Sequence, residues 1–562
     1  MFSPLPTPSE MTHWDHVSAT GFGLLPELLM ENAGRAAMFA LNDALAVGTD
    51  ESEHFAFENI PLAMRRHGLP PHGRRRDSLA PSTPEQASHS QTALADRRVL
   101  LLAGPGNNGG DAMVLARHLH DAGVEVLLLH TRARTDYTGE AAYHFDLALR
   151  DGVPARRAAE ADLRDLRAFD IVVDGLLGTG LSGELRPDML AFVRMVNDLG
   201  RRAFVLALDI PSGLSGLTGR PLPEAVRADC TVTFEAAKLG LAQPEAAPFV
   251  GKLDVRRIGI PRAVRQAHPT EHMAMTAGLA ALLEEPGAGM HKGTAGHVLI
   301  LGGSAGLTGA PMLAAVAAMR AGAGLATIAC PAGIALEVKA SRPEVMLLPL
   351  GQGTQWTADL MDELAPALER FDAVVAGPGL GRSPGAAGFL RAYLDTSRIP
   401  TVFDADALTV LASEKDLLKK IKESAIVTPH PGEMARLLGL ETAEVQADRS
   451  GCSRRLAQEC GAVCVLKGAA SLVAQAGRPL AVSPYREPNL AVAGSGDVLS
   501  GVAGRLLAGG LDAYLAACLS VLWHGHAGRV LSRDFPYRGN MPLEIAHALP
   551  QAIKELKGHA HR

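Results

Sequence analysis

The chain has 562 residues, which is too long for one ordinary hydrophobic core, so its length predicts two domains, or three. Only 4% of the residues are aromatic and 59 are glycine, which favours α/β architecture with many tight strand-to-helix turns over a β-sandwich. The formal charge of −6 and the absence of a long basic run exclude a nucleic-acid-binding role.

The N-terminal sequence and the cysteines predict a cytoplasmic protein with no membrane segment. The first residues, MFSPLPTPSEMTHWDH, have neither the basic start nor the apolar core of a signal peptide. Arg320 and several glycines interrupt the apolar stretch at residues 312–326, so it is too short to span a bilayer. None of the six cysteines forms a CxxC pair, and we therefore expect reduced thiols in the core.

Two helical segments are predicted within residues 9–47, around a turn at Gly21–Gly23. The helix at residues 9–20 is a candidate surface for contact with a second subunit, so a homo-oligomer is an open alternative. Residues 48–96 contain many prolines and serines and charges of both signs, a composition typical of a flexible insertion.

Strands and helices alternate from residue 98 onward, which predicts parallel sheets with helices on both faces. The first set of predicted strands is 98–103, 124–130, 169–175, 202–210 and 229–234. The second set is 297–304, 324–330, 371–379, 399–406, 424–430 and 462–468, followed by apolar helices. The sequence therefore predicts an α/β protein with two domains in series, residues 1–262 and 290–562, joined by a linker with a short helix at 263–289.

Three polar loops follow predicted strands of the first domain. They are GPGNNGGD (104–111), VDGLLGTGLSG (173–183) and LDIPSG (208–213). Because the carboxyl ends of parallel strands lie side by side, we expect these loops to converge on a ligand. Taken alone, the glycine run favours a tight turn in which Asp111 is the N-cap of the next helix.

The polar side chains of these loops indicate two kinds of chemistry. Asn108, Asp174 and Ser212 offer only oxygen ligands, which suits a hard cation. Asp209 is predicted either to move protons as an acid/base or to accept hydrogen bonds from loop N–H groups as a structural carboxylate.

Together with MENAGRA (30–36), these loops resemble the epimerase domain of the NAD(P)H-hydrate repair enzymes, over about residues 9–260 apart from the insertion. The resemblance implies a Rossmann-like domain that interconverts the R and S forms of hydrated NADH and NADPH. It implies K⁺ bound by Asn108, Asp174 and Ser212, and Asp209 as the acid/base or substrate-orienting residue. The hydrate-binding residues that it implies are Asn107, Asn108, Gly109, Gly110, Asp111, Gly178, Thr179, Gly180, Leu181, Ser182, Gly183, Glu184 and Asp209.

The stretch GSGD (494–497) precedes apolar residues at helical spacing, which places it at a helix N-terminus. The N–H groups there can bind an oxyanion. Asp497 has two interpretations: it favours the helix dipole, or it takes the proton of a substrate hydroxyl that attacks a phosphoryl group. In the second interpretation the N–H groups and the carboxylate serve different atoms of the reaction.

Five further motifs accompany GSGD: HKGTAGHVLILGGSAGLTGAP, VVAGPGLG, FDADAL, TPHPGE and LKGAASLV. Together they resemble the dehydratase domain of the same repair enzymes, over about residues 275–555. The resemblance implies a ribokinase-like fold and a reaction with Mg²⁺ and ADP, or ATP in eukaryotic members, that removes water from the S hydrate. Phosphorylation of the ring hydroxyl followed by loss of phosphate would yield NAD(P)H, AMP and phosphate. The implied nucleotide-binding residues are Lys467, Gly468, Ala469, Ala470, Ser471 and Gly496, and the implied hydrate-binding residues are Ala310, Gly379, His430 and Asp497, the catalytic base.

Three points stay open in the sequence. His430, on the extended segment between two prolines, is as typical of a loop-stabilising hydrogen bond as of substrate binding. Asp404 and Asp406 are candidates for a magnesium site and equally for capping the helix that follows. The alternative function is a vitamin-precursor kinase that releases a stable phosphoester, with an N-terminal module that only binds.

Overall fold

A computed structural model describes residues 1–46, 94, 96–181, 183–339 and 342–560. Nearly all of the predicted insertion at 48–96, and the predicted site residue Ser182, lie outside these described residues. The chain forms two compact units, Pro4–Thr270 and Glu271–Arg562, the second of which also includes Met1–Ser3. The division falls within the segment 263–289 that was predicted as a linker.

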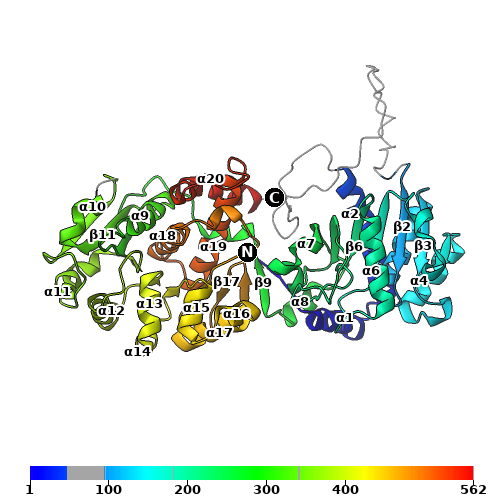
Figure 1. Ribbon diagram of the computed structural model, residues 1–562, viewed down its shortest axis with the longest axis horizontal. Coiled ribbons are helices and arrows are strands. Elements are labelled where there is room, and N and C mark those ends of the chain that lie inside the picture. The colour runs from blue at the N-terminus through cyan, green and yellow to red at the C-terminus, as the bar shows by residue number, and fades with distance from the viewer. Residues whose placement is uncertain (47–93, 95, 182, 340–341, 561–562) are drawn as a thin grey trace, which may run out of the picture. The chain divides into compact units, whose positions relative to one another are not determined.

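The N-terminal unit is built on a parallel sheet in the order β4-β3-β2-β5-β6-β7-β8 (Figure 1). Its strands are β2 (Arg98–Ala103), β3 (Glu125–His130), β4 (Ala155–Arg157), β5 (Ile171–Gly175), β6 (Phe204–Leu208), β7 (Cys230–Phe234) and β8 (Lys252–Arg256). Its helices are α1 (Pro8–Phe22), α2 (Pro26–Ala46), α3 (Asn107–Asp121), α4 (Gly139–Arg150), α5 (Leu163–Leu166), α6 (Pro187–Leu199), α7 (Ala247–Val250) and α8 (Arg262–Ala267). The predicted strands all occur, and β4 and β8 at the sheet edges were missed.

The core of this unit lies on both faces of the sheet, because side chains alternate along each strand. In β2, Val99 and Leu101 belong to the cluster that packs under α2, α3 and α4. Leu100 and Leu102 belong to the opposite cluster, which packs under α6. A strand that is apolar on both faces is what a sheet covered by helices on both sides requires.

The C-terminal unit has a larger mixed sheet, in the order β1-β9-β18-β17-β16-β15-β14-β13-β10-β11-β12. The strands from β16 to β12 are parallel, whereas β17 is antiparallel to both of its neighbours. The strands are β1 (Phe2–Pro4), β9 (His272–Met275), β10 (His297–Leu301), β11 (Leu325–Pro331), β12 (Met346–Leu350), β13 (Ala373–Ala376), β14 (Thr401–Phe403), β15 (Ile426–Val427), β16 (Val463–Leu466), β17 (Leu472–Ala474) and β18 (Leu480–Val482).

Helices cover both faces of this sheet, and α9 and α18 pack against each other over its centre (Figure 1). The helices are α9 (Gly309–Arg320), α10 (Ala335–Lys339), α11 (Leu360–Leu364), α12 (Pro384–Thr396), α13 (Asp406–Ser413), α14 (Lys415–Leu418), α15 (Pro431–Leu438), α16 (Thr442–Ala447), α17 (Arg449–Cys460), α18 (Ser495–Ala508), α19 (Ala513–Ser532) and α20 (Pro542–Ala560). The two helix-covered, largely parallel sheets confirm the predicted α/β class.

The segment 263–289 differs from the predicted linker with one short helix. It contains the end of α8, but also β9, which pairs in parallel with β18 and thereby joins the sheet of the C-terminal unit. The chain's first residues extend the same edge, since β1 lies next to β9 and the Thr276 N–H donates to the Met1 carbonyl. Strands this short carry too few residues for an alternating pattern, which is why the sequence did not reveal them.

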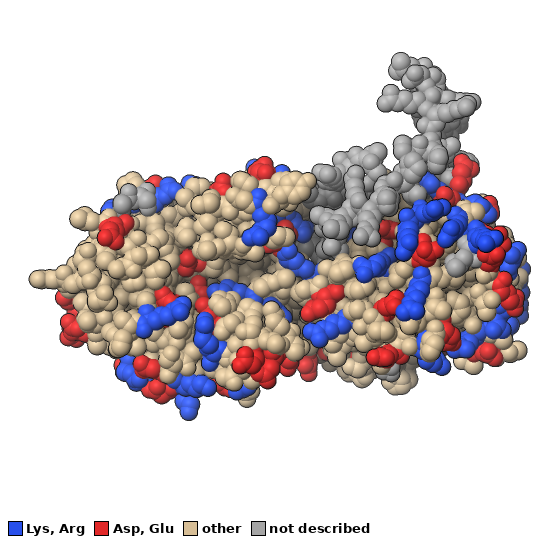
Figure 2. Space-filling view, viewed as in Figure 1, with Lys and Arg blue, Asp and Glu red and all other residues tan. Residues whose placement is uncertain are grey.

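Most charged side chains of the described residues lie at the surface, and the core is mainly apolar. All six cysteines are buried and unpaired. On the face shown in Figure 2, Lys and Arg side chains are interspersed with Asp and Glu. Among the described residues, the helices are too short or too polar to cross a membrane.

Candidate active sites

The first site lies at the carboxyl edge of the N-terminal sheet, where four neighbouring strands end. The register pairs Leu102 of β2 with Asp174 of β5, and Asp174 with Ala207 of β6, while β7 lies next to β6. The three polar loops predicted to converge therefore follow adjacent strands β2, β5 and β6.

The glycine run GPGNNGGD forms the first turns of a helix. Helix α3 begins at Asn107 with Gly106 as its N-cap, so the interpretation of Asp111 as the N-cap is wrong. The glycines of this first turn allow close packing: a Cβ on Gly110 would lie 2.4 Å from the Met30 sulfur of α2. Asp111 is 8% exposed, and among the described residues its carboxyl group has no hydrogen-bond partner.

The MENAGRA motif holds α3 in place. Glu31 of α2 accepts hydrogen bonds from Arg117, at 2.6 Å, and from His118, at 2.8 Å, both on α3. The Asn32 amide donates to the Ile258 carbonyl at 2.8 Å. The motif thus positions the helix that carries Asn107 to Asp111.

The three predicted cation ligands are brought together around Leu177. The Ser212 hydroxyl donates to Asp174 Oδ1 at 2.6 Å, and the Leu177 N–H donates to Ser212 Oγ at 2.9 Å. The Asn108 amide nitrogen donates to the Leu177 carbonyl at 2.9 Å, which leaves Asn108 Oδ1 buried with no partner. An orphaned amide oxygen next to a buried carboxylate is a donor set that a hard cation would satisfy.

Asp174 is fully buried, and among the described residues only neutral groups bond to it. Burial raises the pKa of Asp174 to about 6, although the hydrogen bonds from Ser212 and the Leu176 N–H lower it. A carboxylate without a positive partner here favours a bound cation as its counter-charge.

Asp209 lies directly after β6 with φ of 58° and pairs with Lys238, a residue that the sequence analysis missed. Lys238 is 1% exposed, and its ammonium donates to Asp209 Oδ1, to Thr233 Oγ1 at 3.0 Å and to the Phe234 carbonyl at 3.0 Å. These three bonds use all the protons of the ammonium group. Lys238 therefore orients Asp209 through one carboxylate oxygen and leaves the other available.

The structural interpretation of Asp209 has a hydrogen bond in its favour, because Oδ1 also accepts the Phe234 N–H at 3.3 Å, while the acid/base role stays a prediction. The signal for Lys238 was present in the sequence as a single lysine in the apolar run AAKLGLA, directly after β7. A lysine in such a run is buried only when it has acceptors, and these come from Asp209 and β7.

Two further carboxyl groups face the Asp209–Lys238 pair. Burial raises the pKa of Asp111 well above its ordinary value, the negative charge of Asp209 adds to this, and Lys238 opposes it. Burial likewise raises the pKa of Asp15 of α1 to about 6. The site thus combines an ion-paired carboxylate with a carboxyl group, Asp111, that tends to keep its proton.

The predicted wall at 178–184 lies beside Asn108. A Cβ on Gly178 would be 3.4 Å from Asn108 Cβ. Gly180, Gly183 and Glu184 are exposed, so this segment borders the site on its solvent side.

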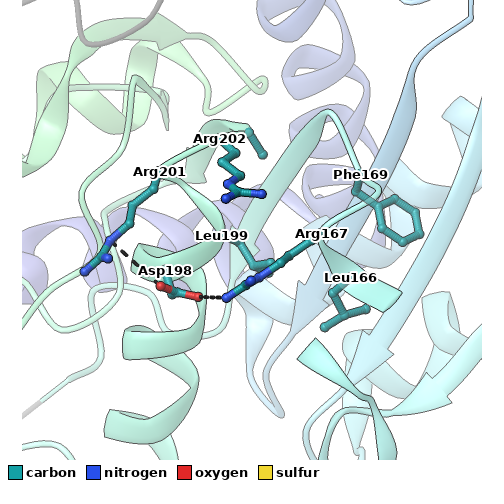
Figure 3. Close-up of a pocket in the computed structure, with 8 residues that line it drawn as sticks. Leu166, Arg167, Phe169, Asp198, Leu199, Arg201 and Arg202 are labelled. Carbon is teal, nitrogen blue, oxygen red and sulfur yellow. Dashed lines mark hydrogen bonds and ion pairs between the residues drawn. The ribbon is translucent and has the colours of Figure 1, made fainter. Parts of the chain in front are cut away.

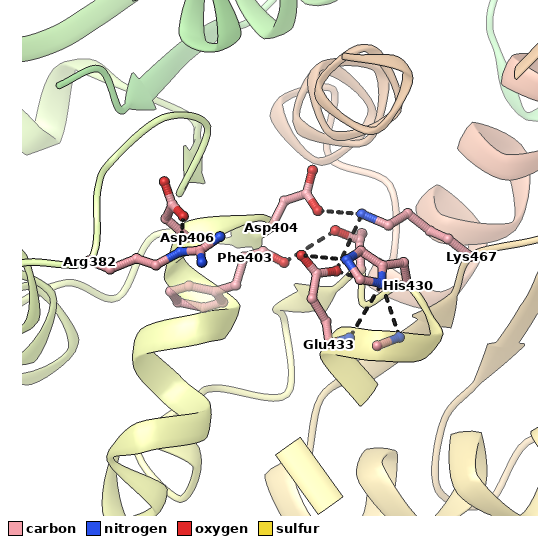
Figure 4. A network of polar contacts seen from close by, with 9 residues as sticks. Arg382, Phe403, Asp404, Asp406, His430, Glu433 and Lys467 are labelled. Atoms are coloured by element: carbon pink, nitrogen blue, oxygen red, sulfur yellow. Dashed lines mark hydrogen bonds and ion pairs between the residues drawn. The ribbon is translucent and has the colours of Figure 1, made fainter. Parts of the chain in front are cut away.

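The second site lies at the carboxyl edge of the C-terminal sheet, after the adjacent parallel strands β16, β15, β14, β13 and β10. Lys467 follows β16, His430 and Glu433 follow β15, and Asp404 follows β14. Figure 4 shows these four side chains directed toward one another. The predicted residues therefore converge from motifs that are far apart in the sequence.

Lys467 is the centre of this network. Its Nζ donates to Asp404 Oδ1 at 2.7 Å and lies 3.8 Å from Glu433 Oε2. Burial opposes charging the lysine, but Asp404, Glu433 and Asp497 outweigh it and raise the pKa of Lys467. A Cβ on Gly496 would lie 3.2 Å from Lys467 Nζ, so the GSGD turn faces the ammonium group.

Helix α18 begins at Ser495, with Gly494 as its N-cap and Asp497 in its first turn. Among the described residues the Asp497 carboxylate accepts no hydrogen bond, so it is not a capping side chain. Burial raises the pKa of Asp497 to about 8, Asp404 adds to this, and Lys467 opposes it. Such a carboxyl group is suited to take up a proton near neutral pH.

The other predicted residues lie on the loop after β16, on α9 and after β13. Residues 467–471 form a tight loop in which Ser471 Oγ donates to the Gly468 carbonyl at 2.9 Å. Ala310 lies one turn before Leu313 on α9, and Leu313 contacts Gly494. Gly379 follows β13 with φ of 63° and packs against the Leu307 carbonyl.

His430 is the N-cap of α15, with an extended backbone as predicted. Its Nδ1 accepts the N–H groups of Gly432, at 3.0 Å, and Glu433, at 3.3 Å. Burial lowers the pKa of His430, and Lys467 and Arg436 lower it further. The ring is then neutral with its proton on Nε2, which lies 3.5 Å from Glu433 Oε1. The His430 side chain is 51% exposed, so this N–H group faces both Glu433 and the open site.

The magnesium candidates Asp404 and Asp406 are both ion-paired. Asp404 bonds Lys467 through Oδ1, and a Cβ on Gly496 would be 3.7 Å from its Oδ2. Asp406 accepts from Arg382 Nε at 2.8 Å and from the Gly381 N–H at 3.0 Å, which makes it part of the loop after β13 (Figure 4).

The pocket in Figure 3 lies at the amino edge of the N-terminal sheet, opposite the carboxyl edge that carries the first site. It has a volume of about 110 Å³ and is formed where β5 and β6 begin, with Arg167 and Arg201 both near Asp198. Since ligands of such sheets bind at the carboxyl ends of the strands, we do not assign the active site there.

The two sheets with their separate polar sites define a bifunctional α/β enzyme. A family model described as YjeF-related protein N-terminus matches residues 26–240, and one described as NAD(P)H-hydrate dehydratase matches residues 298–551. The chain belongs to the family of bifunctional NAD(P)H-hydrate repair enzymes, which confirms the resemblance and the predicted order of two α/β domains in series.

Relatives in this family align over most of the chain. The bifunctional NAD(P)H-hydrate repair enzyme of Moorella thermoacetica is 37% identical over 84% of this chain and 90% of its own, and that of Escherichia coli is 35% identical over 81% and 85%. Among solved structures, an ADP/ATP-dependent NAD(P)H-hydrate dehydratase from Bacillus subtilis is 28% identical, covering 50% of this chain and 96% of its own, with a TM-score of 0.43.

Proposed function

We propose that the N-terminal unit interconverts the R and S forms of hydrated NADH and NADPH, and that the C-terminal unit dehydrates the S form with ADP. The products are NAD(P)H, AMP and phosphate. The observation that carries this proposal is Asp497, a partly buried carboxylate that makes no hydrogen bond to the described residues, at a helix N-terminus that faces Lys467.

In the dehydratase site, the carboxylate and the helix N-terminus serve different atoms. Asp497 takes the proton of the ring hydroxyl as that oxygen attacks the terminal phosphorus of ADP. The N–H groups of the GSGD turn and Lys467 stabilise the charge on the transferred group. The phosphorylated hydroxyl then leaves as phosphate, the neighbouring ring carbon loses a proton, and the dihydronicotinamide is restored.

In the epimerase site, we assign the proton transfers to Asp209 and Asp111. Inversion requires the bond from the ring carbon to its hydroxyl oxygen to break and to form again on the other face. One group must give a proton to the departing oxygen, and another must accept one from the returning water. Burial raises the pKa of Asp111 well above its ordinary value, and Lys238 forms an ion pair with Asp209, so the two residues supply a proton donor and a proton acceptor.

Mg²⁺ would accompany ADP and neutralise part of the phosphate charge. Asp404 Oδ2 is the carboxylate oxygen near Gly496 that is suited to hold it, while Oδ1 stays on Lys467. K⁺ would be held by Asn108, Asp174 and Ser212, where it compensates a buried negative charge.

The K⁺ requirement is expected to depend on pH. Because the carboxylate must be ionised to bind the cation, K⁺ affinity should fall about tenfold per pH unit below the pKa of about 6 for Asp174. The measurement is the K⁺ concentration that gives half-maximal epimerisation between pH 5 and pH 8, at constant ionic strength. Asn108→Ala should raise this concentration at every pH, and an unchanged value would remove Asn108 from the ligand set.

The proposed function is tested by supplying the full chain with S hydrate, Mg²⁺ and ADP and following the near-ultraviolet absorbance of the dihydronicotinamide. Return of NADH with stoichiometric AMP and phosphate supports it. A vitamin-precursor kinase would leave the hydrate unchanged and would release a stable phosphoester from another alcohol substrate, so consumption of ADP without NADH would favour that alternative.

His430 is expected to act both as a cap and as a substrate contact. His430→Ala loses the cap, which should cost about 1 kcal/mol of stability, whereas His430→Asn keeps a capping side chain. Both variants lose the Nε2 donor, so the KM for the hydrate should rise about tenfold in each. Melting temperatures and KM values check this, and a wild-type KM in His430→Asn would reduce His430 to a cap.

A further inference from the structure

The GSGD turn is held by three different elements. Gly494 has φ of 91°, and a Cβ there would lie 2.7 Å from Leu313 of α9. Gly496 faces Lys467, at the end of β16. Between them, Ser495 directs its side chain into the protein, where its Oγ lies 3.1 Å from Nε2 of His524 on α19.

This hydrogen bond is deeply buried. Ser495 is 6% exposed and His524 is 8% exposed. Burial lowers the pKa of His524 to about 4, a hydrogen bond to the Ser495 backbone opposes this, and the nearby charge of Lys467 lowers it further. The imidazole is therefore neutral during turnover, so it holds the serine without placing a second positive charge beside Lys467.

The direction of the N–H groups in this turn depends on that anchor. The first N–H groups of a helix have no intrahelical partner, so only the conformation of the turn aims them. Glycine on each side of Ser495 restricts the backbone little by itself, so the contacts of the turn with its neighbours set its conformation. The bond to α19, a helix of 20 residues, is such a contact at Ser495.

We propose that His524 is a positioning residue of the dehydratase reaction, which fixes Ser495 and thereby aims the N–H groups of Gly496 and Asp497 at the transferred phosphoryl group. The inference rests on the proposed dehydration of the hydrate. His524 does not touch the substrate, so its effect should be on kcat rather than on nucleotide binding.

His297 provides a matched control. It is also a buried histidine whose Nε2 bonds a hydroxyl, Thr327 Oγ1, at 2.8 Å. It is the first residue of β10 and so lies at the amino edge of the sheet, away from the site. Loss of either bond should lower stability, but only the loss at His524 should change catalysis.

The experiment uses the full chain with S hydrate, Mg²⁺ and ADP, and compares His524→Leu, His524→Gln, Ser495→Ala and His297→Leu. His524→Leu and Ser495→Ala should lower kcat about tenfold or more, because misdirected N–H donors stabilise less charge. The Kd for ADP should stay within about threefold of the wild-type value. A double variant that combines His524→Leu with Ser495→Ala should be no slower than the slower of these two single variants. His524→Gln, which can still bond Ser495, should recover most of the activity, while His297→Leu should only lower the melting temperature.

The inference is overturned if kcat in Ser495→Ala stays within about twofold of the wild type, or if His297→Leu is slowed as much as His524→Leu. Ser495→Ala tests the same hydrogen bond should His524→Leu fail to fold. An inactive wild-type enzyme would overturn the proposed function and this inference together, whereas an active wild type with unaffected variants would overturn the inference alone.

Discussion

Asp497→Asn should yield a folded, ADP-binding protein whose dehydratase kcat is about 10²- to 10⁴-fold lower. The amide cannot accept the proton of the ring hydroxyl. The substitution should cost little helix stability, because the N-cap of α18 is Gly494 and the Asp497 carboxylate makes no hydrogen bond to the described residues. Single-turnover kinetics with S hydrate and ADP measure the effect, and epimerisation by the same variant is the internal control.

The pH dependence of the wild type offers a second measurement of the same group. The pKa of Asp497 is raised to about 8, so the base becomes ionised only as the pH rises through that value. The dehydratase kcat/KM should therefore increase with pH and level off above about pH 8. In Asp497→Asn the residual rate should lose this dependence.

The same variant should be more stable than the wild type at alkaline pH. A carboxyl group with a raised pKa binds its proton more tightly in the folded state, so its ionisation costs stability between the ordinary pKa of 3.8 and about 8. The asparagine does not carry this cost, so the gain in melting temperature should be fully developed above about pH 8 and should vanish toward pH 4. A variant that retains more than about a tenth of kcat, or that is less stable at every pH, would contradict the assignment of Asp497 as a base in a desolvated site.

Asp209→Asn should abolish epimerisation and leave dehydration of the S form unchanged. With pure R hydrate, ADP and Mg²⁺, the variant should return NADH only at the rate of spontaneous epimerisation. The reason is that an amide accepts no proton and does not balance the charge of Lys238. Turnover of R hydrate well above the spontaneous rate would remove Asp209 from the mechanism.

Lys238→Met separates proton transfer from orientation. It keeps the Asp209 carboxylate but removes the ammonium group that binds Oδ1. We expect a partial loss of epimerisation that is smaller than in Asp209→Asn, because the carboxylate remains but the ammonium group no longer orients it. The dehydratase rate is the control for both variants, and an equal loss in the two would mean that the ion pair acts only as a unit.

Much of the architecture was present in local sequence patterns. Apolar runs such as Val99–Ala103 and Val298–Leu301 end at glycine turns, and alternation of such strands with helices specifies a parallel sheet whose carboxyl edge carries the polar loops. The position of GSGD before an apolar helix likewise located the second site, because helix spacing and N-terminal geometry are local properties.

The pairings that make the sites work were decided by the tertiary structure. Lys238 meets Asp209 across adjacent strands, and His524 meets Ser495 from another helix. Local patterns do not encode these contacts, because they depend on how elements distant in the chain pack. The pKa of Asp497 near 8 has the same origin, since burial and the charge of Asp404 raise it. The sequence by itself determined which elements form and where their polar loops lie, whereas packing determined which charges are buried, which are paired and therefore which can move a proton.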